Sequence, residues 1–479
     1  MIHRYKLDGF NIILDVASGS IHSVDDIAYE AIELYESGGP GLVLKKLRSK
    51  YKQLSADDIT ELIGDIESLI HDGKLFAKDT YNDAAAKTGA ASVKALCLNV
   101  AHACNMRCAY CFAGNGEFSG LDSSIMPLET GKRAIDFLVE NSGGHKTLDV
   151  DFFGGEPLLN WGVVKEIVFY ARCLEKSTGK NFRFTLTTNG LLIDDDVISF
   201  TNEEMYNVVL SLDGRRETHD KHRKLAGQRA ADECNIECNN ASGNANGDSF
   251  GTYLTVVPKI KRLVEARGEK SYYIRGTFTR DNLDFTKDIL HLHDLGFNEL
   301  SMEPVVGNSD SGLGLTSDDI DAIYKQYELL AGEMRKRGKE GRGFTFYHYM
   351  INLTGGPCIH KRVAGCGVGK EYVAVTPQGE LYPCHQFIGD DRFVLGDIWQ
   401  GFIREELRQN FAKRGIYTND ECRKCWARFY CSGGCAANAF HASGSICGLH
   451  ELGCKLFKKR IECAIMLKVA EALDKTAGS

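Results

Sequence analysis

Residues 94 to 320 repeat one pattern of hydrophobic and polar positions: a short apolar run, a polar or glycine-rich turn, then helical spacing. Apolar runs of strand length lie at 94–100, 148–153, 183–188, 207–212, 272–279 and 299–306. Helical spacing separates them, as at 129–141 and 161–177. Strands that alternate with helices pair in parallel, because a crossover helix returns the chain to the same edge of the sheet. The pattern predicts an α/β fold whose six β/α units curve into a partial (β/α)6 barrel.

The first 80 residues follow a different pattern. Short alternating runs at 5–7, 11–15 and 20–24 are separated by Asp-Gly and Ser-Gly turns, and helical spacing follows. Ser55 and Asp58 match a capping box, and Gly73 marks a helix end. The helix between them has one apolar face: Ile59, Leu62, Ile63, Ile66, Leu69 and Ile70. We therefore predict a separate module of three strands and three helices at 1–80, followed by an Ala-, Lys- and Gly-rich linker at 81–93.

The last third of the chain has little periodicity. Residues 321–356 are expected to bridge the barrel to a Cys- and Gly-rich region at 357–455, where bound metal is expected to replace part of a hydrophobic core. An amphipathic helix is predicted at 456–479. Its apolar face comprises Phe457, Ile461, Ile465, Val469 and Ala472.

Composition excludes several partners. The 479 residues are 43% hydrophobic and 25% charged, which is ordinary for a globular protein. The net charge of -8 and the pI near 6.0 favour neither nucleic acid nor an anionic membrane surface as a partner. The start of the chain lacks the apolar core of a signal peptide, and no run of apolar residues is long enough to span a membrane. We expect a cytoplasmic protein.

The chain has 17 cysteines, an odd number, and thiols remain reduced in the cytosol, so metal binding is favoured over disulfides. Cys104, Cys108 and Cys111 form CxxxCxxC directly after the first barrel strand, at the edge where sites form in parallel sheets. Three thiolates suit an iron–sulfur cluster with one iron that has no protein ligand. Structural zinc is the alternative, but it prefers four ligands. An open iron is able to bind a substrate or cofactor.

CxxxCxxC with the aromatic Tyr110 resembles the signature of radical S-adenosylmethionine (SAM) enzymes, in which the open iron chelates SAM. The resemblance implies that the three cysteines hold this cluster and that Tyr110 lies beside it and the adenosine; it assigns no further catalytic residue. Gly154-Gly155-Glu156 after the second strand matches the GGEP motif, which contacts the SAM amino group. Two glycines permit close backbone approach, and a carboxylate accepts from an ammonium.

Later strand ends extend this expected SAM site. The resemblance implies that Ser211, in SLDG, and Arg223 contact SAM, and that the polar residues beside them belong to the same site. Each of these segments alone is also compatible with an ordinary turn. The full set of predicted cofactor-binding residues is Tyr110, Gly154, Gly155, Glu156, Thr188, Asn189, Ser211, Asp213 and Arg223.

The segment CRKCWARFYCSGGC resembles the SPASM signature of radical SAM enzymes that modify peptides. The resemblance implies one auxiliary 4Fe–4S cluster on Cys422, Cys425, Cys431 and Cys454. Candidate ligands of a second auxiliary cluster are Cys358, Cys366, Cys384 and Cys435, and one of them stays off the iron if that cluster is open. A zinc ribbon is the alternative.

The remaining cysteines have no ligand role in this scheme. Cys97, Cys173 and Cys463 lie in apolar strand or helix patterns and are predicted to be core thiols. Cys447 is spare. Cys234 and Cys238 lie in an Asn-, Gly- and Ala-rich insertion at 228–247, which is expected to be a surface loop, with an extra ligand pair or a redox pair as alternatives.

Nearly the whole chain resembles the radical SAM/SPASM maturases of SCIFF (six cysteines in forty-five residues) peptides, which form thioethers of the ranthipeptide type. The phrases LDVDFFGGEPLLNW, FRFTLTTNG, SMEPVV, FYHYMINLTGGPC, LYPCHQF and CWARFYCSGGCAANAFHASGS carry this resemblance. It implies a TIM-like radical SAM barrel, an N-terminal winged-helix-like RiPP recognition element and a C-terminal SPASM domain. Gly307-Asn308 departs from the pattern, because relatives are expected to have a cysteine there.

The resemblance also implies an activity. SAM and three 4Fe–4S clusters would generate a 5′-deoxyadenosyl radical, which takes a hydrogen from a core-peptide residue before a substrate cysteine thiolate attacks the carbon radical. The partners would be a ribosomal precursor peptide, whose leader adds a β-strand to the N-terminal module, and a reducing protein such as flavodoxin or ferredoxin. A DNA-binding winged helix is disfavoured because the module is not strongly basic. The alternatives are an anaerobic sulfatase-type maturase that forms formylglycine and a non-catalytic iron–sulfur scaffold that binds peptides.

Overall fold

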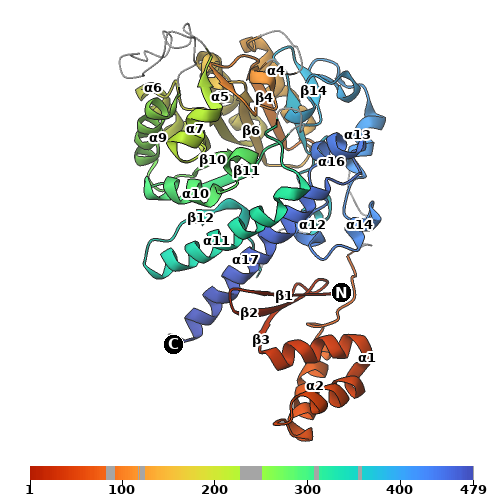
Figure 1. Cartoon of the computed structure of the whole chain (residues 1–479). Helices are drawn as coiled ribbons and strands as arrows, with labels where there is room; N and C mark the ends of the chain where they lie inside the picture. Colours follow the sequence, from red (N-terminus) through yellow and green to blue (C-terminus); the bar gives the residue numbers. More distant parts are fainter. Residues whose placement is uncertain are drawn as a thin grey trace.

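The computed structural model describes residues 1–81, 92–116, 118, 124–226, 251–306, 312–353 and 359–477 (Figure 1). Residues 82–91 of the predicted linker, the whole insertion at 228–247 with Cys234 and Cys238, Gly307-Asn308 and Cys358 lie outside these residues. No helix in the described ranges is both long and apolar enough to cross a membrane.

The N-terminal module has the predicted elements. Strands β1 (Ile2–Leu7), β2 (Phe10–Asp15) and β3 (Ile21–Val24) form an antiparallel sheet in the order β1-β2-β3. Helix α1 (Asp26–Lys50) is interrupted at Gly39, where φ is 72° and Pro40 follows, so with α2 (Ala56–His71) the module has three helical segments. The capping box at Ser55 is present, and the predicted apolar face of α2 packs into the module's own core.

The six predicted barrel strands are confirmed. They are β4 (Ala95–Ala101), β6 (Thr147–Gly154), β7 (Asn181–Thr188), β8 (Met205–Ser211), β10 (Tyr272–Phe278) and β11 (Glu299–Pro304). All six are parallel, and each pairs with the next along the chain. The short β12 (Thr345–Phe346) follows β11 at the edge of the sheet, so the barrel is open, as predicted.

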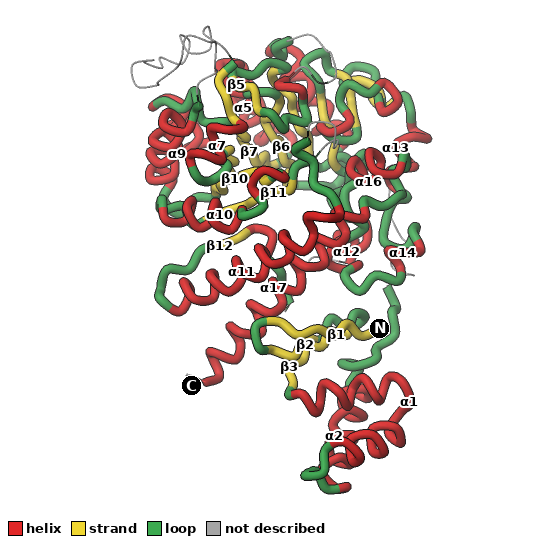
Figure 2. The backbone as a smooth tube through the Cα atoms, viewed as in Figure 1, coloured by secondary structure: helices red, strands yellow, loops and turns green. Residues whose placement is uncertain are grey.

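Helices of the repeated β/α units flank this sheet (Figure 2). They include α4 (Leu128–Asn141), α5 (Trp161–Thr178), α6 (Asp195–Glu204), α7 (Arg216–His222), α9 (Tyr253–Arg267) and α10 (Phe285–Asp294). Alternate apolar strand residues such as Leu98, Phe152 and Ile274 pack against these helices in the main core. Because successive strand residues point to opposite faces, the residues between them face inward. These inward residues are largely polar, among them Asn99, Asp151, Thr185, Arg275 and Glu303.

The Cys-rich region is more regular than its sequence predicts. Strand β13 (Tyr372–Val375) pairs in parallel with β4 and continues the barrel sheet, and the antiparallel β14 (Glu380–Tyr382), β15 (Gly396–Asp397) and β16 (Gly401–Phe402) follow. The region also has an aromatic core, so metal is not its only expected source of stability. Strands of two to four residues are too short to produce a period in the sequence. Short helices complete the region: α12 (Ile359–Ala364), α13 (Glu405–Ala412), α14 (Asp420–Arg423), α15 (Arg428–Cys431) and α16 (Ala436–Ser443).

Helix α17 (Glu451–Ala477) begins five residues before the predicted 456 and therefore includes Cys454. It is not amphipathic in the predicted way: Cys463 and Met466, off the predicted face, are buried, whereas Ala472, on it, is exposed. The reason is that α17 packs between α11 (Ile320–Lys339) and strand β1 (Figure 1). Tyr5 in β1 donates to the carbonyl oxygen of Glu462 at 2.9 Å, so the N-terminal sheet rests on α17.

The prediction for the non-ligand cysteines is correct for Cys97 and Cys463, which are buried, and wrong for Cys173, which is exposed. The buried face of α5 is Val164, Ile167, Val168 and Ala171. Cys173 follows Ala171 by two positions, which places it on the opposite side of a helix with 3.6 residues per turn.

Candidate active site

The loop after β4 brings the three cysteines of the CxxxCxxC motif together at the carboxyl edge of the sheet. Within it, β5 (Met106–Cys108) pairs in antiparallel fashion with β9 (Arg223–Leu225), and Cys108 lies opposite Arg223. The thiols of Cys104, Cys108 and Cys111 lie close enough together to influence one another's ionisation. This strand pair, which joins the cysteine loop to Arg223, was not predicted, because three-residue strands leave no periodic signal.

Burial shapes the acidity of these thiols. It raises the pKa of Cys108 to about 11, although the neighbouring Arg223 opposes the shift, and it also raises the pKa of Cys104. Backbone N–H groups point at the sulfurs: Met106 donates to Cys104 Sγ at 3.4 Å, and Asn115 donates to Cys111 Sγ at 3.3 Å. Metal ligation requires thiolates, so loading of this site must release protons.

The two glycines of GGEP lie against the cysteine loop. A Cβ on Gly154, where φ is 133°, would lie 2.3 Å from the carbonyl oxygen of Ala101, and a Cβ on Gly155 would lie 2.1 Å from that of Ala103. The N–H of Gly155 donates to Ala101 O at 2.8 Å, and the N–H of Glu156 donates to Ala103 O at 2.9 Å. We expected these glycines to let the backbone approach a ligand; in the structure they let strand β6 approach the loop that carries Cys104.

Glu156 is almost fully buried beside this loop. Its Oε1 accepts from Leu158 N at 3.0 Å and from Thr188 Oγ1 at 2.8 Å, and its Oε2 accepts from Asn189 N at 2.8 Å. Burial raises the pKa of Glu156 to about 7, against the effect of these hydrogen bonds. The Asn189 side-chain amide donates to Asn105 Oδ1 at 2.8 Å and lies 3.8 Å from Cys104 Sγ. The ends of β6 and β7 are thus joined to the cysteine loop.

Asp213 organises the other side of the site. It is fully buried, its Oδ2 accepts from the Tyr110 hydroxyl and lies 3.1 Å from Arg223 Nε, and its Oδ1 accepts from Thr277 N at 3.0 Å. The Arg223 guanidinium lies 5.6 Å from the centre of the Tyr110 ring. The carboxylate therefore positions both residues. Ser211, the last residue of β8, is half-buried at the same edge.

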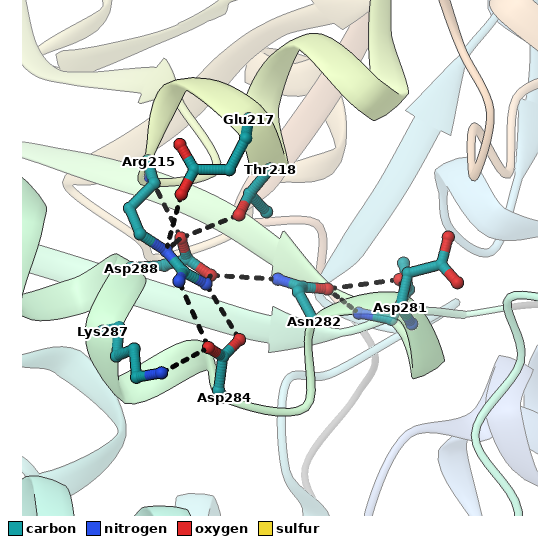
Figure 3. Close-up of polar contacts among 9 residues, drawn as sticks. Arg215, Glu217, Thr218, Asp281, Asn282, Asp284, Lys287 and Asp288 are labelled. Carbon is teal, nitrogen blue, oxygen red and sulfur yellow. Dashed lines mark hydrogen bonds and ion pairs between the residues drawn. The ribbon is translucent and has the colours of Figure 1, made fainter.

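A further anchor, absent from the sequence predictions, holds the segment after Asp213 (Figure 3). Arg215 lies between two carboxylates of the α10 region, with Nε 2.7 Å from Asp288 Oδ1 and Nη2 2.8 Å from Asp284 Oδ1. Asp288 is fully buried and also accepts from Thr218 Oγ1 at 3.0 Å. The signal in the sequence that could have identified this anchor is the acidic Asp288 among the apolar residues of α10.

The C-terminal cysteines form two further groups. Cys422, Cys425, Cys431 and Cys454 lie within electrostatic reach of one another, as expected for one ligand set. Cys366, Cys384 and Cys435 form the other group. In the described ranges, no group of three His, Cys, Asp or Glu side chains lies close enough together to hold a single metal ion.

The second of these groups adjoins the loop of Cys104, Cys108 and Cys111 through His385, which follows Cys384. The His385 ring lies 4.9 Å from that of Phe153 at the end of β6 and 5.5 Å from that of Phe112, which follows Cys111. The Tyr372 hydroxyl lies 3.3 Å from His385 Nδ1. His385 was not predicted from the sequence, because its contact depends on the pairing of β13 with β4.

The surroundings of Arg414 indicate whether these thiol groups suit anionic clusters. Its side chain is 7% exposed, and its guanidinium donates to the carbonyl oxygens of Ile446, at 2.8 Å, and Gly433. Among the described residues it has no carboxylate partner, yet its charge reaches Cys366 in one group and Cys422 in the other. A buried cation needs a counter-charge, and thiolate-ligated clusters on both sides would supply it. The residues present therefore fit iron–sulfur clusters.

Comparison with known proteins agrees with this arrangement. Residues 98–265 match the radical SAM superfamily, and residues 366–426 match SPASM, an iron–sulfur cluster-binding domain. The chain is 30% identical over 362 residues to a cysteine-type anaerobic sulfatase-maturating enzyme of Clostridium novyi, which covers 70% of this chain and 85% of that enzyme. It is 21% identical over 385 residues to the radical SAM cyclopropyl synthase TigE of Paramaledivibacter caminithermalis, covering 76% and 72% respectively. A match to an uncharacterized protein of Methanocaldococcus jannaschii, 34% identical over 122 residues, spans only 39% of that protein and 26% of this chain.

Solved structures share the fold. The structure of anSMEcpe with bound AdoMet has a TM-score of 0.61 at 21% identity and covers 79% of this chain and 99% of its own. Streptococcus suis SuiB bound to precursor peptide SuiA has a TM-score of 0.52 at 13% identity and covers 94% and 98%. The chain belongs to the radical SAM enzymes that carry a SPASM domain.

Proposed function

We propose that this enzyme installs cysteine thioether crosslinks in a ribosomally made, Cys-rich precursor peptide. The observation that carries the proposal is the N-terminal module, whose sheet is docked on α17 through β1. The anSMEcpe match covers 79% of this chain, whereas the match to SuiB, solved with a precursor peptide, covers 94%. A docked module of this kind suits an enzyme that holds a leader segment while it modifies the core of the same peptide.

The free edge of the module is the expected leader site. In the order β1-β2-β3, the outer strands are β1, which lies against α17, and β3. A leader peptide would add to the sheet beside β3 through main-chain hydrogen bonds. Tethering of the leader raises the effective concentration of the core near the barrel, so weak core contacts suffice.

The residues divide the chemistry between them. Cys104, Cys108 and Cys111 would hold the SAM-binding cluster, and the two C-terminal cysteine groups, with Cys358, would hold two auxiliary clusters. When bound, these cofactors supply the reductive cleavage of SAM and one-electron transfer. Around them, Glu156 and Asn189 fix one side of the site, while Asp213 orients Tyr110 and Arg223 on the other.

The overall reaction balances with SAM as the oxidant. The substrate loses one hydrogen from carbon and one from a thiol as a C–S bond forms. The carbon-bound hydrogen leaves in 5′-deoxyadenosine, and the thiol hydrogen leaves as a proton. The electron that opens SAM comes from a reducing protein such as flavodoxin or ferredoxin and is regained when the C–S bond forms.

The test is an anaerobic assay of the cluster-loaded enzyme with SAM, a reductant and the small Cys-rich peptide encoded beside the gene. The expected product has lost two hydrogens per crosslink, and one 5′-deoxyadenosine forms for each. Cleavage of SAM with no change in the mass of the peptide would reject this activity.

The second candidate is a sulfatase-type maturase that oxidises cysteine or serine to formylglycine. It is supported by the 30% identity to the Clostridium novyi enzyme across 85% of that enzyme's length. The same assay separates the two candidates, because formylglycine reacts with a hydrazide probe and a thioether does not.

A further inference from the structure

Two charged side chains of opposite sign occupy the inner face of neighbouring barrel strands and belong to none of the cysteine or SAM groups. Arg275 lies on β10 and Glu303 on β11. In the parallel register, Arg275 pairs with Ser301 and Thr277 pairs with Glu303, so the carboxylate lies two positions nearer the carboxyl edge. Their chain neighbours Ile274 and Met302 are buried under the helices, which leaves both charges on the inner side.

Glu303 is held as an ionised acceptor. Its Oε1 lies 3.3 Å from His348 Nε2, and Arg460 Nη1 of α17 lies 2.9 Å from His348 Nδ1. Burial opposes ionisation of the carboxyl, but His348, Arg275 and Arg460 outweigh it and hold the pKa of Glu303 below its usual value. The Glu303 side chain remains 30% exposed, so the carboxylate is accessible to a ligand.

The Arg275 side chain is a donor without a partner in the part of the chain that the structure describes. Its guanidinium has no carboxylate within ion-pair distance and donates no hydrogen bond among these residues, whereas Glu303 and Arg460 both contact His348. Its charge nevertheless reaches groups from four elements, namely Tyr273, Glu303, His348 and His385. Arg275 thus lies in the middle of the polar inner face, near Glu303 but not bonded to it.

An unbonded donor beside an accessible acceptor matches the polarity of peptide backbone. In an extended segment, the N–H and C=O of one residue point to the same side, which is how a strand offers both to its neighbour. We propose that Arg275 and Glu303 bind the backbone of the core peptide, Arg275 by donating to a carbonyl oxygen and Glu303 by accepting from an N–H. This inference rests on the proposed peptide substrate. Because it assigns recognition to the peptide main chain, different substrate residues are able to bind between Arg275 and Glu303.

The experiment uses the cluster-loaded full chain with saturating SAM and, as the probe, the uncharged synthetic peptide acetyl-Ala-Thr-Cys-Ala-Thr-Cys-Ala-amide. Anaerobic calorimetry measures its affinity, and peptide-independent formation of 5′-deoxyadenosine checks that the SAM site is intact. Substitution Arg275→Met or Glu303→Gln is expected to weaken binding by about 10- to 100-fold, and Arg275→Lys by less, because lysine keeps the charge without the fork. The matched control is Arg183→Met, on the same inner face but paired with Asp149 at 2.6 Å, which should leave the affinity unchanged.

The outcomes separate the two proposals. Backbone binding by this pair is wrong if Arg275→Met binds the neutral peptide as tightly as the wild type does, or if the wild type does not bind it. It is also wrong if the substitutions change the affinity only for a peptide with an acidic side chain. If binding depends on Arg275 but no crosslink forms with the peptide encoded beside the gene, the backbone site stands and thioether formation fails. If crosslinks form with equal KM in the wild type and in Arg275→Met, thioether formation stands and the backbone site fails.

Discussion

The Asp213–Arg223 pair allows the sharpest test of how the site is held. Asp213 is fully buried and Arg223 is 7% exposed, with their charged atoms 3.1 Å apart. The substitution Asp213→Asn keeps the shape and the acceptor for Thr277 N but leaves a buried guanidinium without its counter-charge. Removal of one partner of a buried pair costs about 3–5 kcal/mol. The double variant Asp213→Asn/Arg223→Met removes the orphaned charge and should regain about 0.5–3 kcal/mol of that loss.

The measurement is urea unfolding of the cluster-free protein under reducing conditions, followed by circular dichroism, together with SAM binding to the loaded protein. Asp213→Asn should lower the unfolding midpoint and weaken SAM binding, because Tyr110 and Arg223 lose their common partner. The control is Asp195→Asn, which removes a pair with Arg262 whose side chains are 88% and 57% exposed and should leave both quantities unchanged. If the double variant is no more stable than Asp213→Asn, or if the control loses as much, the pair does not organise the site.

Three further predictions follow from single contacts. The substitution Gly155→Ala places a Cβ 2.1 Å from the carbonyl oxygen of Ala103 and should displace the cysteine loop. The iron content should then fall by about a third, while the far-UV circular dichroism spectrum is retained. The control is Gly162→Ala, where no atom lies within 4 Å of the added Cβ. Burial lowers the pKa of His219 to about 3, below the value near 6.5 of an unfolded chain, so its contribution to stability is present above pH 6.5 and is lost as the pH falls toward 3. The substitution His219→Gln should therefore make the unfolding midpoint fall less steeply with pH over that range. An unchanged slope would contradict this. The substitution Arg414→Met should lower the reduction potentials of the auxiliary clusters, because the reduced, more negative state loses a nearby cation. Potentiometric titration followed by EPR measures these potentials. The control is Arg404→Met, at an exposed arginine of the same domain, which should leave the potentials unchanged.

The sequence by itself determined the parts that depend on local order. Each barrel strand carries its own apolar alternation, and the capping box at Ser55 satisfies the helix end with residues three apart, so these elements were predictable within a few residues. The spacing of Cys104, Cys108 and Cys111 likewise predicted the first thiol group, because residues so close in sequence stay together whatever the rest of the fold does. The two C-terminal groups join cysteines that are far apart in sequence, such as Cys384 and Cys435, and were expected only from the resemblance to the SPASM signature. The strand ends that carry Glu156, Asn189 and Asp213 were predictable as neighbours because parallel strands end at one edge.

Only the tertiary structure decided which of these residues bind one another. Asp213 positions Tyr110 and Arg223, and the GGEP glycines make room for the cysteine loop. Both arrangements depend on segments that the fold brings together across the sheet. The extension of the barrel by β13, the burial of α17 on several sides and the exposure of Cys173 follow from which elements pack together. Arg275, which has no partner among the described residues, belongs to the same class, because a missing partner is a property of the whole surroundings and no pattern along the chain records it.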